Sequence, residues 1–127
     1  MTTALDLEPG EFLREYWGRS PLLTRVSGDF ANPLTPEELA GLAMEEDVES
    51  RLVRGSGTRL TMEHGPFAAS SFQGDPPWTL LVQSVDHHVP AVAALRKLVD
   101  FLPGWQLDDV MVSYATDGGG VGPHFDN

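Results

Sequence analysis

The segment Asp109-Val-Met-Val-Ser-Tyr-Ala-Thr-Asp-Gly-Gly-Gly-Val-Gly-Pro-His-Phe-Asp126 combines a strand pattern, a glycine-rich turn and an H-x-D tripeptide. Two sets of side chains alternate over residues 110–115, which predicts a β-strand with two different faces. The glycines of 118–122 permit backbone angles and close approaches that a side chain would prevent. Pro123 then favours an extended backbone leading into His124.

The H-x-D tripeptide has two interpretations. In an extended backbone, His124 and Asp126 project to the same side, while Phe125 turns to the opposite, apolar side. A converging imidazole and carboxylate are half of a metal site. With one more histidine from a distant strand, they form the facial triad of non-haem Fe(II) oxygenases. The alternative is a histidine and an aspartate in a polar loop, because H-x-D alone is a weak signal.

The composition limits the class of protein. The length of 127 residues suits one domain with its own core, and the absence of cysteine excludes disulfides, zinc ribbons and thiolate catalysis. A net charge of −11 argues against direct binding to nucleic acid and favours a basic protein or peptide as a partner. No apolar run approaches the ~20 residues of a membrane span, and the N-terminal segment lacks signal-peptide features. We therefore expect a soluble cytoplasmic protein.

Three segments have helical patterns. Residues 9–17 form an amphipathic pattern whose aromatic stripe is expected to be core. Thr35 and Glu38 form a predicted capping box, and the acidic residues of 45–49 either follow an early helix end or face something basic. Residues 91–102 are predicted as the best helix of the chain. The apolar stripe of this last helix consists of Val92, Leu95, Val99 and Leu102.

Strands are predicted at four further places. Residues 22–26 are a plausible first strand, and 50–54 and 58–62 form a hairpin around a Gly-Ser-Gly loop at 55–57. Residues 78–85 have the pattern of a buried strand. The remaining histidines, His64, His87 and His88, are assigned to loops and turns. No carboxylate or second histidine lies at ligand spacing beside His64, and the side chains of the adjacent His87 and His88 project in different directions.

Six blocks, in order, resemble the bacterial ribosomal oxygenases: 12–23, 47–53, 64–67, 78–83, 108–113 and 118–126. These are JmjC-type, cupin-fold Fe(II)/2-oxoglutarate dioxygenases that hydroxylate an arginine of a large-subunit ribosomal protein. The resemblance covers essentially all 127 residues. It implies an α+β fold in which N-terminal helices and strands lead into an incomplete JmjC/cupin double-stranded β-helix, or jelly roll.

The resemblance also implies a site and its ligands. His124 and Asp126 take the places of the first two iron ligands, and Ser113 faces the cosubstrate and substrate pocket. The implied cofactor is Fe(II), the cosubstrate is 2-oxoglutarate, and the substrate is a large-subunit ribosomal protein, without a membrane partner or direct nucleic-acid binding.

The family's other functional parts lie beyond Asn127. They are the second histidine, the basic residue that holds 2-oxoglutarate, most of the barrel, and the C-terminal dimerisation region. Residues 1–127 are therefore expected to be the N-terminal part of a JmjC/cupin domain that ends just after H-x-D. We expect a homodimer only for the full-length protein. We expect the 127-residue chain alone to be inactive, to bind iron weakly and to aggregate or unfold.

Two alternative functions remain open. The chain could belong to a related JmjC oxygenase that acts on histidine or methyl-lysine, because the pocket that selects the target lies mostly outside these residues. It could instead be a non-catalytic binding module that keeps the N-terminal fold. Fe(II) affinity distinguishes the second alternative, since replacing His124 or Asp126 with alanine would then leave metal binding unchanged.

Overall fold

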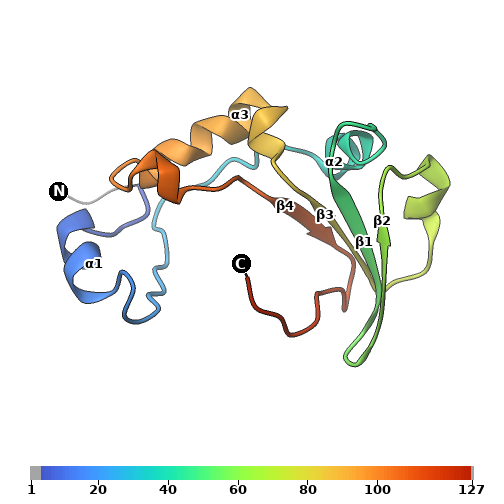
Figure 1. Ribbon diagram of the computed structural model, residues 1–127, viewed down its shortest axis with the longest axis horizontal. Helices are drawn as coiled ribbons and strands as arrows, with labels where there is room; N and C mark the ends of the chain where they lie inside the picture. The colour runs from blue at the N-terminus through green and yellow to red at the C-terminus, as the bar shows by residue number, and fades with distance from the viewer. Residues whose placement is uncertain (1–3, 127) are drawn as a thin grey trace. The chain divides into compact units, whose positions relative to one another are not determined.

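The computed structural model describes residues 4–126. They form two compact units, one made of residues 4–32 and 94–108 and the other of residues 33–93 and 109–126. Both units contain helices, and the second contains a four-stranded antiparallel sheet (Figure 1). The predicted α+β class is therefore confirmed. Over the described part of the chain, no helix has the length and apolar character needed to cross a membrane.

The first unit begins with helix α1 (Pro9–Glu15), as the pattern of residues 9–17 predicts. The Glu8 carboxylate caps this helix by accepting hydrogen bonds from the backbone N–H groups of Gly10 at 3.0 Å and Glu11 at 2.6 Å. These hydrogen bonds lower the pKa of Glu8, with the bond from Glu11 contributing most. Gly18, with φ of +71°, lies in the turn that follows the helix.

Aromatic rings hold α1 against the second segment of the first unit. The ring centroid of Phe12 lies 6.4 Å from that of Tyr16, 5.8 Å from Trp17 and 6.0 Å from Phe101. Phe12 and Tyr16 are half-buried, whereas Trp17 is exposed. The expected core role of the aromatic stripe thus applies to two of its rings and not to Trp17.

The strand predicted at 22–26 is absent, and this prediction is wrong. Leu23 is 78% exposed, and the described part of the first unit contains no strand with which the segment could pair. β-propensity describes side chains that suit a sheet, but a strand forms only where a neighbour accepts its backbone hydrogen bonds.

The continuous helix predicted at 91–102 is also wrong. Helix α3 (Pro90–Ala93) is one turn long, and a 3₁₀-helix follows at Ala94–Val99. The apolar stripe recurs at an average spacing of about 3.3 residues, between the 3.6 of an α-helix and the 3.0 of a 3₁₀-helix. Such a stripe fits both helix types. A further 3₁₀-turn lies at Gly104–Gln106.

The second unit is built on a sheet with the strand order β2-β1-β3-β4, in which all neighbours are antiparallel. Its strands are β1 (Ser50–Ser56), β2 (Arg59–His64), β3 (Trp78–Val82) and β4 (Val112–Ala115). The predicted hairpin is present, but its loop is Gly57-Thr58, because β1 continues through Gly55. A Cβ on Gly55 would collide with the carbonyl oxygen of Arg59, so only glycine fits at this position of the strand.

The strand register divides the side chains between two faces. One face, which we call the helix face, carries Ser50, Leu52, Arg54, Trp78, Leu80, Val82, Val112 and Tyr114, with Arg59, Thr61 and Glu63. The opposite face is called the tail face, because the C-terminal segment 116–126, the tail, lies against it. It carries Arg51, Val53, Thr79, Leu81, Ser113 and Ala115, with Leu60, Met62 and His64. Every residue of β3 is buried, so this strand is covered on both faces.

Helix α2 (Pro36–Leu42) starts with the predicted capping box. Thr35 Oγ1 accepts from the Glu38 N–H at 3.1 Å, and the Thr35 N–H donates to Glu38 Oε1 at 3.2 Å. The helix ends before the four acidic residues of 45–49, which are all exposed, while Val48 between them is buried. The alternative in which the helix stops early is therefore the observed one.

The helix face is the core of the second unit. The Phe67 N–H donates to the Ala43 carbonyl at 2.9 Å, which ties the end of α2 to the segment after β2. Leu52, Leu80 and Val82 are fully buried on this face. A row of aromatic rings runs from this core to the surface, with centroid separations of 5.7 to 6.3 Å. The row runs through Phe67, Phe72, Trp78 and Tyr114.

Candidate metal centre

Strand β4 carries the first candidate residue to the tail face of the sheet. Ser113 lies opposite Leu81 of β3 and is exposed, whereas Tyr114 points to the helix face, where its ring centroid lies 5.7 Å from that of Trp78. The predicted strand with two different faces is therefore confirmed, although it begins at Val112 and not at Val110.

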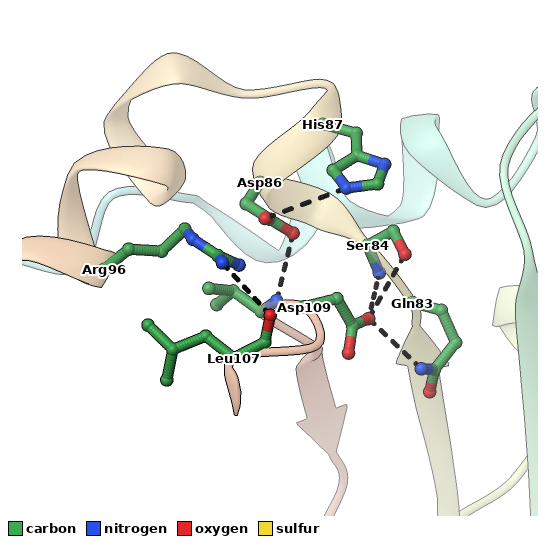
Figure 2. A network of polar contacts seen from close by, with 8 residues as sticks. Gln83, Ser84, Asp86, His87, Arg96, Leu107 and Asp109 are labelled. Carbon is green, nitrogen blue, oxygen red and sulfur yellow. Dashed lines mark hydrogen bonds and ion pairs between the residues drawn. The ribbon is translucent and has the colours of Figure 1, made fainter. Parts of the chain in front are cut away.

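A carboxylate anchors the segment that leads into β4 (Figure 2). Asp109 Oδ2 accepts hydrogen bonds from the Ser84 N–H at 2.6 Å, from Ser84 Oγ at 3.3 Å and from Gln83 Nε2 at 3.2 Å. Gln83 Oε1 accepts in turn from Arg51 Nη2 at 2.9 Å. A chain of polar contacts therefore runs from β1 across the end of β3 to the segment that precedes β4. Sequence reasoning missed these residues, because no local pattern connects them.

A second carboxylate holds the next residue of the same segment. Asp86 Oδ1 accepts from the Val110 N–H at 3.0 Å, and the Val110 carbonyl accepts from the Val85 N–H at 3.0 Å. The Asp86 side chain is almost fully buried, and its Oδ2 lies 3.9 Å from His87 Nε2. Val110 is thus bound through both of its backbone groups, which anchors the chain two residues before β4 begins.

The other end of β4 is held by a threonine. Thr116 Oγ1 accepts from the Trp78 N–H at 2.9 Å and donates to the Trp78 carbonyl at 3.1 Å. The Thr116 N–H also donates to that carbonyl, at 3.0 Å. Thr116 was likewise not identified from the sequence.

The glycine run allows the tail of the chain to lie directly on the sheet. A Cβ on Gly119 would lie 2.7 Å from the Trp78 carbonyl oxygen, 2.8 Å from Thr79 Oγ1 and 2.9 Å from the Thr116 carbonyl oxygen. A Cβ on Gly122 would lie 3.0 Å from Leu60 Cδ1 of β2. The tail therefore contacts β3 and then β2 at positions where a side chain would force it away.

The H-x-D side chains converge at the end of this tail. His124 Nε2 lies 3.4 Å from Asp126 Oδ1. His124 Nδ1 lies 2.8 Å from the Gly122 carbonyl oxygen, which only accepts hydrogen bonds, so Nδ1 carries the proton of this contact. In the neutral ring, the lone pair of Nε2 is then free and lies on the side of the ring that faces the Asp126 carboxylate. Both side chains are exposed, at 56% and 95%.

This arrangement fits a divalent cation. A carbonyl acceptor on one ring nitrogen is a common way to orient a metal-binding histidine. Metal–ligand distances of about 2.0–2.2 Å place two neighbouring ligand atoms about 3 Å apart, close to the separation of Nε2 and Oδ1. Within residues 4–126, no His, Asp or Glu joins this pair to make a group of three. Phe125 is fully exposed, so the expected packing on an apolar side does not occur among these residues.

The sequence of this chain is similar to those of two bacterial ribosomal oxygenases. No protein-family model matches the chain. The ribosomal protein uL16 3-hydroxylase of Escherichia coli (strain K12) is 44% identical over 128 residues, covering 99% of this chain and 34% of the relative. The probable ribosomal oxygenase of Haemophilus influenzae is 37% identical over 123 residues, covering 94% of this chain and 30% of the relative.

A solved structure agrees with these sequences. YcfD, a ribosomal oxygenase from Escherichia coli in complex with cobalt and 2-oxoglutarate, superimposes with a TM-score of 0.89 and is 43% identical. The match covers 98% of this chain and 35% of YcfD. The chain is therefore homologous, over nearly all of its length, to the ribosomal oxygenases, and it spans about one third of the relatives that it matches.

Proposed function

We propose that residues 1–127 are the N-terminal part of a JmjC/cupin oxygenase that uses Fe(II) and 2-oxoglutarate to hydroxylate an arginine of a large-subunit ribosomal protein. The geometry of the H-x-D tripeptide carries the proposal: His124 Nε2 and Asp126 Oδ1 converge to 3.4 Å at the end of a glycine-rich tail. The relatives support it, because one is named for hydroxylating uL16 and the YcfD structure contains cobalt and 2-oxoglutarate.

In this proposal His124 and Asp126 are two of the iron ligands. The Gly122 carbonyl keeps the proton on His124 Nδ1, which leaves Nε2 to bind the metal. Fe(II) bound there would supply oxidative chemistry on dioxygen with 2-oxoglutarate as cosubstrate. The third ligand and the group that anchors 2-oxoglutarate would come from outside residues 4–126.

The tail face of the sheet is the proposed reaction side. Ser113 is exposed on this face, which supports a position towards the cosubstrate and substrate. A net charge of −11 favours approach of a basic ribosomal protein over direct contact with nucleic acid. A ribosomal-protein substrate also implies a cytoplasmic location, and homodimerisation is proposed only for the full-length protein.

The proposal is tested by metal binding to the purified chain. Calorimetric titration with Co²⁺ should detect binding that His124→Ala and Asp126→Ala each weaken by at least roughly ten-fold, as expected when one of two ligands is lost. His88→Ala is the matched control, because His88 is exposed and belongs to the turn before α3. It should leave the affinity unchanged.

The opposite result decides against catalysis at this site. If both ligand variants bind Co²⁺ as tightly as the parent chain, the H-x-D tripeptide is a polar loop pair. The chain is then better described as a binding module that keeps the N-terminal fold of the oxygenases.

A further inference from the structure

We infer that Thr116 is a positioning residue for the candidate metal site: its side chain fixes the point from which the glycine-rich tail carries His124 and Asp126 over the tail face. The inference rests on the proposed function, since it takes these two residues as metal ligands. The hydrogen bonds of Thr116 join it to Trp78 and Gly119 and not to either candidate ligand, so its role is exerted through the backbone of 116–122.

Strand β4 is too short to define its own register. Its ladder with β3 extends only from the pair Val82–Val112 to the pair Thr79–Ala115. A slip of one residue would turn Ser113 to the helix face and would move the start of the tail by one residue. The groups that hold the two ends of the strand therefore help to specify its register, together with the packing of Tyr114 on Trp78.

Thr116 holds the end from which the tail departs. Its hydroxyl accepts from the Trp78 N–H at 2.9 Å and donates to the Trp78 carbonyl at 3.1 Å. The Thr116 backbone N–H donates to the same carbonyl at 3.0 Å. One side chain thus binds both backbone groups of a buried residue in the inner strand β3. A valine in its place would have the same shape but would offer neither bond.

The position of Thr116 is transmitted to the ligands through close backbone contacts. The Gly119 N–H donates to the Thr116 carbonyl at 2.8 Å, and Gly119 lies directly on Trp78 and Thr79. Three residues later, Gly122 lies against Leu60, and its carbonyl accepts from His124 Nδ1. The contacts at Gly119 and Gly122 leave little free space, so a displacement of the Thr116 backbone is expected to move the His124 imidazole as well.

Two substitutions at Thr116 test this role. Thr116→Val removes both side-chain hydrogen bonds, and Thr116→Ser keeps the hydroxyl. We expect Thr116→Val to lose amide-exchange protection at Gly119 and to weaken Co²⁺ binding roughly ten-fold, a typical effect of disturbing the groups that orient a ligand. Thr116→Ser should retain both properties. Exchange protection of the β1–β3 ladder should persist in both variants, which shows that the sheet remains folded.

A control separates positioning from a general loss of stability. Thr35→Ala removes the N-cap of α2 in the same unit and should destabilise the fold without changing Gly119 exchange or Co²⁺ affinity. The inference is wrong if Thr116→Val keeps the exchange protection of Gly119, or if Thr35→Ala weakens Co²⁺ binding equally. If His124→Ala binds Co²⁺ like the parent, the proposed function fails, while Gly119 exchange still decides whether Thr116 fixes the tail.

Discussion

The two faces of the four-stranded sheet are covered in different ways. The helix face carries the fully buried Leu52, Leu80 and Val82, and Leu80 is 1% exposed. The tail face carries the exposed Ser113 and is approached by backbone at Gly119 and Gly122. Three buried side-chain atoms have no hydrogen-bond partner among the described residues: Thr79 Oγ1 and Arg51 Nε on the tail face and Ser50 Oγ on the helix face.

The two faces are therefore expected to have different roles, one in the stability of the fold and the other in the position of the candidate ligands. Burial of apolar surface is non-directional and depends on area, so the helix face is expected to determine the free energy of unfolding. Hydrogen bonds and close backbone contacts are directional, so the tail face is expected to determine where the candidate ligands lie. Substitutions on each face should therefore change different measured quantities.

Leu80→Ala should have the largest effect on stability. Removing a fully buried side chain from the helix face should lower the free energy of unfolding by about 2–5 kcal/mol. Urea denaturation measures the change. Leu23→Ala is the control, because Leu23 is 78% exposed and should change stability by no more than about 0.5 kcal/mol. Equal effects of the two variants would mean that the helix face is not the core.

Gly119→Ala tests the tail face directly. Its added methyl group would meet two carbonyl oxygens and a hydroxyl at 2.7 to 2.9 Å, so the tail must move. We expect a loss of about 1–3 kcal/mol in stability and a weaker affinity for Co²⁺. Gly120→Ala is the matched control in the same glycine run, because no atom lies within 4 Å of its added Cβ. If both variants bind Co²⁺ equally well, the close contact at Gly119 does not position the ligands.

Asp109→Ala should have a smaller effect. It removes the acceptor for Ser84 and Gln83, but these donors are only half-buried and regain water, so we expect a loss of about 1 kcal/mol. Thermal unfolding should show it, together with faster amide exchange at Ser84. Asp108→Ala serves as the neighbouring control, because Asp108 is exposed. An unchanged exchange rate at Ser84 would rule out the proposed anchoring of β4.

The smallest expected effect lies outside both faces, at the N-cap of α1. Hydrogen bonds from Glu11 and Gly10 lower the pKa of Glu8 in the folded state, so its contribution is present above the unfolded pKa and is lost as the pH falls through the folded pKa. Acidification should therefore speed amide exchange of Gly10 and Glu11, as followed by NMR. Glu8→Gln should remove this pH dependence, and its persistence in that variant would assign the effect to another group.

Local contacts explain the successful sequence predictions. The capping box of α2 involves residues three apart, and the alternation in β4 and the convergence of His124 and Asp126 follow from residues two apart. Backbone geometry alone brings such residues together. The glycine run also indicated close approach, but not which atoms the glycines would meet.

Contacts between distant residues decided what sequence patterns did not. Thr116 reaches Trp78 across 38 residues, and Asp109 reaches Ser84 across 25. Residues 22–26 have the composition of a strand but no partner among the described residues of their unit, and the stripe over 91–102 fits two helix types. The sequence by itself therefore determined the local elements and the paired candidate ligands. Only the tertiary structure decided strand pairing and the anchoring of the tail, because both depend on hydrogen-bond partners that are remote in the chain.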